Sequence, residues 1–267
     1  MNLPTTVAVV TGSGRGIGLA FARRLAEAGH RVLLTDIDES TVRAAAETIE
    51  GATWIQQDVR DAESHAVVAA RAAELGDLRV WVNNAGVLIA GEPWTHLQAD
   101  VDRSFDVNVR GVIAGSHAAV RAMTGPGRIL NVASTAALAP VPGLAIYGAT
   151  KAAVLSFSTS LQGDLARAGS QIRVHALCPD VTATAMVDDV ATDPGASILF
   201  AGSRQLEPDQ VAVAGMELLA SRQVARAVPR AMGAVARLTS LSPALALRLA
   251  ASTRRTGEKN QRRGADR

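Results

Sequence analysis

The segment TVAVVTGSGRGIG, residues 6–18, decides the fold of this chain. Its apolar start at 6–10 predicts a buried strand, and Ile17, Phe21 and Leu25 then recur at helical spacing until Gly29 ends the pattern. Between the two lies a turn rich in glycine. Free N–H groups at a helix N-terminus attract anions, and glycines let a pyrophosphate approach the backbone. A plain glycine-rich turn is the alternative interpretation at this point.

The same alternation of strand and helix continues along the chain. Further strands are predicted at 31–36, 52–58, 78–86, 127–134, 171–179 and 223–228. Helical patterns occupy 62–75, 95–122, 147–168 and 208–221, and another reaches residue 49 from a cap at Ser40 or Thr41. This pattern predicts one α/β domain over 1–229, a Rossmann-type doubly wound parallel sheet of about seven strands with helices on both faces. Ligands are expected at the carboxyl ends of the strands.

The second predicted strand ends at Asp36. A carboxylate there is placed to accept a hydrogen bond from an adenosine ribose, and it would repel a 2′-phosphate. This favours NAD over NADP as the cofactor. Arg15 favours the opposite choice more weakly, because a cation in the glycine turn can pair with that phosphate.

Composition removes several classes of protein. The 267 residues are 48% hydrophobic and 19% charged, which suits one large domain. A single cysteine, Cys178, excludes a disulfide scaffold and a multi-cysteine zinc site, and the five histidines have no ligand spacing, so no metal site is expected. We see no signal-peptide pattern and no apolar run of membrane-spanning length, and we expect a cytoplasmic protein.

The net charge of +2 is unevenly distributed. Residues 251–267 hold six basic and two acidic side chains, or +4, which leaves about −2 for the rest of the chain. The body therefore has no basic face of the kind that binds nucleic acid. The simplest expectation for the basic tail is a solvated, frayed segment.

The only tyrosine, Tyr147, lies four residues before Lys151, one of only two lysines. On a helix the two side chains share a face. Moving a hydride between an alcohol carbon and a nicotinamide requires a group that exchanges a proton with the alcohol oxygen. A phenol has an ordinary pKa near 10, and a nearby ammonium lowers it. The pair therefore fits proton transfer, and a surface Tyr–Lys pair is the alternative.

Taken together, these motifs resemble the short-chain dehydrogenase/reductase family. TGSGRGIG, Asp58-Val59, NNAG at 83–86, Asn108, Ser134, Tyr147 and Lys151 follow one another from residue 6 to about 186. The resemblance implies that Ser134 holds the substrate oxygen and that Tyr147 is the general acid/base. It implies that Lys151 binds the nicotinamide ribose and lowers the tyrosine pKa. Asn108 would serve a water-linked proton relay, or would instead be a structural residue that bends a helix.

The resemblance also implies a set of cofactor contacts. Asp58 and Val59 would flank the adenine, the NAG segment would line the adenosine ribose, and the segment from Pro179 would receive the carboxamide. The full set is Gly12, Ser13, Arg15, Gly16, Ile17, Gly18, Asp36, Asp58, Val59, Asn84, Ala85, Gly86, Tyr147, Lys151, Pro179, Thr182 and Thr184.

Asp180 departs from the family, which usually has glycine after this proline. Its carboxylate would contact a polar substrate group, favour the cationic oxidised cofactor, or simply cap the following turn. The substrate residues are predicted to be Ser134, Leu144, Asp180 and Met186. The loops 138–146 and 184–205 are apolar, with Leu138, Val141, Leu144, Met186, Ile198, Leu199 and Phe200. This favours a lipophilic substrate, unless these side chains pack on the core or on a partner subunit.

Residues 230–267 form an extension that common family members lack. Helical segments at 230–240 and 244–255 are separated by Pro243 and followed by arginines. Three interpretations compete: a lid on the substrate site, a contact in a homodimer or homotetramer, and weak binding to a membrane surface.

The sequence thus predicts an NAD(H)-dependent oxidoreductase that interconverts a lipophilic secondary alcohol and its ketone by hydride transfer, with Tyr147 as the general acid/base. One alternative is an NADP(H)-dependent ketoreductase of the 3-oxoacyl type. Another is a non-catalytic dinucleotide-binding regulatory protein, although such a protein has no need of Ser134, Tyr147 and Lys151 together.

Overall fold

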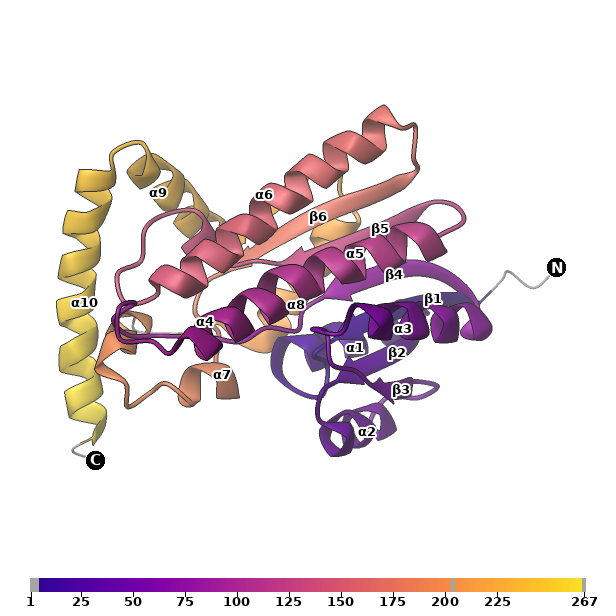
Figure 1. Ribbon diagram of the computed structural model, residues 1–267, viewed down its shortest axis with the longest axis horizontal. Coiled ribbons are helices and arrows are strands. Elements are labelled where there is room, and N and C mark those ends of the chain that lie inside the picture. Colours follow the sequence, from indigo (N-terminus) through magenta and orange to yellow (C-terminus); the bar gives the residue numbers. More distant parts are fainter. Residues whose placement is uncertain (1–4, 203–204, 266–267) are drawn as a thin grey trace.

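The computed structural model describes residues 5–202 and 205–265. Within them lies a seven-stranded sheet with the order β3-β2-β1-β4-β5-β6-β7, and every pair of neighbours is parallel (Figure 1). The strands are β1 (Thr6–Thr11), β2 (Arg31–Asp36), β3 (Thr53–Gln56), β4 (Asp77–Asn83), β5 (Gly127–Val132), β6 (Ile172–Pro179) and β7 (Ala225–Val228). The strand order reverses between β1 and β4, which is where a doubly wound sheet opens a crevice for ligands.

Helices cover both faces of this sheet, as predicted. The helices of the described chain are α1 (Gly16–Glu27), α2 (Glu39–Glu47), α3 (Ala62–Leu75), α4 (Gln98–Phe105), α5 (Gly111–Ala122), α6 (Ala145–Arg167), α7 (Ala185–Asp188), α8 (Pro208–Leu219), α9 (Arg230–Ser240) and α10 (Pro243–Ala265). Three short elements join them, the π-helical turn η1 (Asp106–Arg110) and the 3₁₀ turns η2 (Thr135–Ala137) and η3 (Pro194–Phe200). On one face α1 packs against α8, and on the other α3 packs against α5.

The central strands are apolar on both sides because both sides are covered. In β1, Val10 joins a core cluster with Phe21 of α1, whereas Val9 joins the opposite cluster with Trp81 and Val174. Successive residues of a strand point to opposite faces, so a near-continuous apolar run feeds two separate cores. The two cores hold the carboxyl ends of the strands in a fixed arrangement.

Some boundaries differ from the sequence predictions. The cap of α2 is Asp38, whose carboxylate accepts from the Thr41 N–H, so the predicted caps Ser40 and Thr41 are wrong. The predicted helical stretch 95–122 contains the π-helical turn η1 between α4 and α5. Hydrophobic spacing does not reveal the extra residue that a π-helical turn inserts, because the helices on either side keep their own apolar faces.

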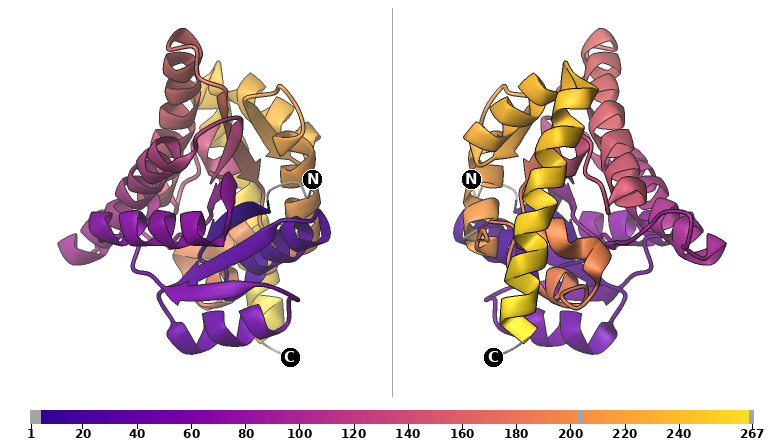
Figure 2. Two further views of the ribbon diagram at one scale, coloured as in Figure 1. Left: turned by 90° about the vertical axis from the view of Figure 1, so that its right-hand side faces the viewer. Right: turned by 90° about the vertical axis from the view of Figure 1, so that its left-hand side faces the viewer.

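The basic tail is the largest departure. The helix predicted to end near 255 continues to Ala265 and lies along the outside of α9 and η3 (Figures 1 and 2). Gln261 Nε2 donates to the carbonyl oxygens of Ala191 and Asp193, at 3.0 and 3.2 Å. The expectation of a frayed tail is therefore wrong up to this residue. No helix in the described residues is both long and apolar enough to span a membrane.

Candidate active site

A cavity of about 1340 Å³ opens at the carboxyl ends of the strands. Its volume exceeds the roughly 300–1,000 Å³ of a typical small-ligand site, as a site for a dinucleotide and a second molecule would require. Most of the predicted site residues line it, namely Gly12, Arg15, Gly16, Ile17, Asp36, Asp58, Val59, Asn84, Ala85, Gly86, Ser134, Leu144, Tyr147, Lys151, Pro179, Asp180, Thr182, Thr184 and Met186. Ser13, Gly18 and Asn108 do not.

The glycine turn between β1 and α1 forms one wall. Gly12 and Gly16 have φ values of +61° and +58°, a region that side chains disfavour. A Cβ on Gly12 would lie 2.6 Å from the Cα of Ala85, so only glycine fits there. The first turn of α1 has no side-chain cap, which leaves its N–H groups available to an anion. This arrangement fits the pyrophosphate of a dinucleotide.

Ser13 and Gly18 lie behind this wall. The Ser13 hydroxyl donates to the carbonyl oxygens of Val10 and Thr35, at 2.8 and 3.3 Å, and the side chain is fully buried. A Cβ on Gly18 would collide with the carbonyl oxygen of Gly12. Their side-chain positions therefore shape the turn instead of facing the cavity.

Asp36 stands at the end of β2, as predicted. Its Oδ2 accepts from the N–H of Gly14 at 3.0 Å, and its Oδ1 accepts from the N–H of Asp38 at 3.3 Å. Two backbone donors thus hold the carboxylate at the edge of the cavity. Arg15 is exposed and lines the same cavity. The cavity therefore contains both the carboxylate that would repel a 2′-phosphate and the guanidinium that could pair with it.

Asp58 and Asn84, which follow β3 and β4, have different partners. Asp58 forms an ion pair with Arg60, whose hydrogen bonds lower the pKa of that carboxyl group. Asn84 Nδ2 donates to the carbonyl oxygens of Thr11 and Gly12, at 3.0 and 2.8 Å. Asn84 therefore fixes the end of β4 against the glycine turn.

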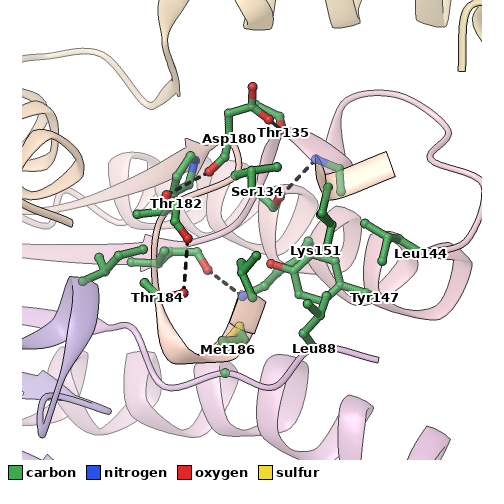
Figure 3. A pocket seen from close by; sticks show the side chains of 18 of the residues that line it. Leu88, Ser134, Thr135, Leu144, Tyr147, Lys151, Asp180, Thr182, Thr184 and Met186 are labelled. Atoms are coloured by element: carbon green, nitrogen blue, oxygen red, sulfur yellow. Dashed lines mark hydrogen bonds between the residues drawn. The ribbon is translucent and has the colours of Figure 1, made fainter. Parts of the chain in front are cut away.

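Ser134, Tyr147 and Lys151 lie together at another part of the cavity (Figure 3). Ser134 follows β5, and its Oγ accepts from the N–H of Ala136. Tyr147 and Lys151 are one turn apart on α6, with the Lys151 Nζ 5.7 Å from the centroid of the phenol ring. The same Nζ donates to the carbonyl oxygen of Val132 at 3.0 Å, which holds it near the end of β5.

Burial dominates the acid–base properties of this pair. It raises the pKa of Tyr147 to about 12, against a smaller lowering by a hydrogen bond with Ser134. It also lowers the pKa of Lys151 to about 8. The spacing alone led us to expect a lowered tyrosine pKa. The difference arises because burial destabilises the phenolate by more than the hydrogen bond with Ser134 stabilises it.

Asn108 lies in η1, close to Gly86 and Lys151. Its Oδ1 accepts from the N–H of Val87 at 2.8 Å, and its Nδ2 donates to Val87 O and to Thr150 Oγ1. A Cβ on Gly86 would lie 3.2 Å from the Asn108 Oδ1 and 3.5 Å from the Lys151 Nζ. The amide is therefore close to the lysine, but its side chain is already occupied in bracing the backbone at Val87.

Asp180 lines the cavity beside η2. Its Oδ1 accepts from the Thr135 hydroxyl at 3.1 Å, and its N–H donates to the carbonyl oxygen of Val228. In Figure 3 the Asp180–Thr135 pair lies on the other side of Ser134 from the Tyr147 ring. Because this carboxylate bonds a hydroxyl group of a neighbouring element, we find no support for the turn-capping interpretation.

The apolar loops form the rest of the predicted substrate region. Leu144, Met186, Val141, Ile198 and Leu199 line the cavity. The other two predicted residues pack elsewhere: Leu138 against a cluster that includes Val112 and Ala133, and Phe200 in a cluster with Leu144 and Ala196.

One wall contains no residue that was named from the sequence, although a lid on the substrate site was one of the three interpretations of the C-terminal extension. Met232, Val235, Ala236, Ala246, Leu249, Ala250 and Thr253 of α9 and α10 also line the cavity. Their spacing on α10 was an available signal, but alanine-rich apolarity is too weak to show which face is inward. Among the described residues, no group of histidine, cysteine, aspartate and glutamate is arranged to hold a metal ion.

Comparison with known proteins agrees with this geometry. Residues 6–195 match the protein family described as short chain dehydrogenase. The chain is 36% identical over 197 residues to the 4-formylbenzenesulfonate dehydrogenase TsaC1/TsaC2 of Comamonas testosteroni, covering 71% of this chain and 77% of that protein.

Two solved structures share the fold. A short-chain dehydrogenase/reductase from Burkholderia phymatum in complex with NAD superimposes with a TM-score of 0.83 at 29% identity, over 90% of this chain and 95% of that one. A variant of actinorhodin polyketide ketoreductase with NADPH gives a TM-score of 0.78 at 28% identity, over 86% and 97%. This chain belongs to the short-chain dehydrogenase family and is an oxidoreductase that uses a nicotinamide dinucleotide.

Proposed function

We propose that the protein is an NAD(H)-dependent dehydrogenase that interconverts a lipophilic secondary alcohol and its ketone, with Tyr147 as the general acid/base. One observation carries the proposal. A single cavity is lined by an uncapped helix N-terminus, by a strand-end carboxylate at Asp36, and by Ser134, Tyr147 and Lys151. The first two features suit a dinucleotide, and the last three suit proton transfer at an oxygen.

In this proposal Ser134 binds the substrate oxygen and Tyr147 transfers the proton. When bound, the nicotinamide ring accepts or donates the hydride. The Ser134 hydroxyl donates a hydrogen bond to the substrate oxygen and stabilises the charge that develops there. During oxidation the Tyr147 Oη takes the proton that the alcohol loses, and during reduction it returns a proton to the carbonyl oxygen.

Lys151 acts on Tyr147 through its charge. Its Nζ is 5.7 Å from the ring centroid, and a cation at that distance favours the phenolate over the phenol. Asn108 supports both groups from behind, because it holds Val87 and Thr150 around the lysine. We propose that Asn108 serves the proton relay through its position close to the Lys151 Nζ.

The choice of NAD rests on Asp36. Its carboxylate is held at the cavity edge by two backbone donors, where it can accept from a ribose hydroxyl and would repel a phosphate. Arg15 in the same cavity favours the alternative, an NADP(H)-dependent ketoreductase. We give more weight to Asp36, because an unpaired like-charge contact is more costly than a missing ion pair at an exposed side chain.

The lipophilic substrate rests on the lining of the cavity. Leu144, Met186 and Ile198 line it near Tyr147 and along the loop after β6. Apolar lining favours ligands of the same character.

We also propose a homodimer or homotetramer in the cytoplasm, with weak membrane contact as an open prediction for α10. Light scattering tests the oligomeric state, and vesicle co-sedimentation tests the membrane contact.

The test is a screen of purified protein against secondary alcohols and ketones, followed at the nicotinamide absorbance with NAD(H) and with NADP(H). We expect turnover of lipophilic members with a higher kcat/KM for NAD(H). A preference for NADP(H) would contradict the cofactor proposal. Cofactor binding with no turnover of any member would favour a regulatory dinucleotide-binding protein instead.

A further inference from the structure

Helix α10 presents one continuous face to the cavity. Ala246, Leu249, Ala250 and Thr253 line it, and they follow one another at i, i+3, i+4 and i+7. Ala246 and Ala250 are almost fully buried there. The same face continues one turn further to Gly257, which is also buried. The inner face of α10 therefore forms part of the cavity wall over its first half.

Gly257 marks the point where α10 touches η3 (Pro194–Phe200), in the loop after β6. A Cβ on this glycine would collide with the carbonyl oxygen of Ser197 in η3. Glycine inside a helix is less favourable than alanine, so its presence there needs a compensating reason. In contrast, Gly163 of α6 has nothing within 4 Å of its Cβ position. The close approach of two backbones is the reason at Gly257.

Side-chain hydrogen bonds complete the contact. Asn260 Nδ2 donates to the carbonyl oxygen of Phe200 at 2.9 Å, and Gln261 Nε2 donates to the carbonyl oxygens of Ala191 and Asp193. Together with Gly257 they fasten α10 to the segment 191–200, whose Ile198 and Leu199 also line the cavity. The second half of α10 thus fixes the segment 191–200, and the first half of α10 lines the same cavity as that segment.

We propose that α9 and α10 form a specificity-determining wall that binds the apolar part of the substrate and sets how large that part can be. This rests on the proposed function, because it names the substrate class of the same site: ketones and secondary alcohols with a long or bulky apolar group. Burial of each CH₂ of such a group against the wall contributes about 0.8 kcal/mol, or roughly fourfold in affinity. Small ketones that reach only Ser134 and Tyr147 gain nothing from this wall.

Two leucines of α10 give a matched pair for the test. Leu249 and Leu247 are 48% and 49% exposed, but only Leu249 is among the cavity-lining residues. We expect Leu249→Ala to raise the KM for 2-undecanone about five- to twentyfold, with kcat and the kinetics of 2-butanone little changed. Leu247→Ala should leave both ketones at wild-type values.

The outcomes separate the two levels of the proposal. If the wild-type protein reduces neither ketone, the proposed function is contradicted. If it reduces them and the two leucine variants behave alike, the wall assignment is overturned while the proposed function stands. A wild-type preference for 2-butanone over 2-undecanone would also overturn it.

The fastening of α10 has a test that needs no turnover. Gly257→Ala should separate α10 from η3 and speed trypsin cleavage at Arg254, Arg255 and Lys259 several-fold. The circular dichroism spectrum of the whole protein should stay nearly unchanged, which shows that the variant is folded. Gly163→Ala is the control, because its site has room for a methyl group. We also expect Gly257→Ala to raise the KM for 2-undecanone. Equal cleavage rates in the two variants would contradict the contact.

Discussion

At the scale of single residues, the candidate site brings together groups that the surrounding backbone and helices hold in position. Asp36 is held by two backbone N–H groups at the cavity edge, and Tyr147 and Lys151 share one face of α6. The sequence predicted these positions because spacing on a helix and the end of a strand are local properties. It did not predict the direction of the Tyr147 pKa shift, because burial depends on residues distant in sequence.

We propose that Asp36 controls the choice between NAD and NADP. We expect Asp36→Ala to lower the ratio of kcat/KM for NAD to that for NADP by at least about tenfold, or 1.4 kcal/mol, since it removes the repulsion of the 2′-phosphate. Steady-state kinetics with both cofactors measure this ratio. Asp164→Ala, which removes an exposed carboxylate of α6, is the control. An unchanged ratio in Asp36→Ala would show that the carboxylate does not discriminate.

Lys151 links stability to pH in the protein without ligand. Its pKa falls from an ordinary 10.5 to about 8 on folding, because the ammonium is buried. Between these values the unfolded chain holds a proton that the folded protein has released, so stability rises with pH by up to about 1.4 kcal/mol per unit. Tyr147, with its raised pKa of about 12, opposes this only above pH 10.

Urea unfolding of the wild type and of Lys151→Met from pH 7.5 to 10 tests this linkage. We expect the wild type to gain stability relative to the variant as the pH rises through that window. A difference that stays constant with pH would mean that the lysine is not desolvated in the folded protein.

At the scale of elements, the strands and most helices follow from the hydrophobic pattern. The strands carry apolar runs that are buried on both sides, and their residues are close together in sequence. The π-helical turn η1 did not follow, because hydrophobic spacing does not reveal it; its Asn108 bonds Val87 and Thr150, which are distant in sequence. The cap at Asp38 was missed because three adjacent polar residues were equally suitable by type.

Asn108 shows what η1 contributes to stability. Removal of its buried amide leaves the N–H and carbonyl groups of Val87 without these partners. We expect Asn108→Ala to lower the free energy of unfolding by about 1–3 kcal/mol, the usual cost of unsatisfied buried polar groups. Urea titration measures this, with Gln98→Ala on the exposed side of α4 as the control. A loss no larger than that of Gln98→Ala would contradict the bracing role.

At the scale of the whole molecule, the C-terminal extension is what the sequence left open. Its alanine-rich helices have weak apolar faces, so the pattern left a lid, a subunit contact and weak membrane binding open, with strong membrane binding disfavoured. In the structure α10 returns to the carboxyl edge of the sheet and contacts the loop after β6 (Figure 2). The contact joins residues about sixty positions apart, such as Asn260 and Phe200, and no local pattern reveals such a pairing.

The most direct test of the central claim compares the wild type with Tyr147→Phe in the same preparation, by nicotinamide binding and by turnover. We expect the variant to bind NADH as the wild type does and to lose about 10²–10⁴-fold or more in kcat, because only the proton-exchanging hydroxyl is missing. If Tyr147→Phe binds NADH and still turns over the substrate at the wild-type rate, the claim that this chain uses Tyr147 as its general acid/base is contradicted.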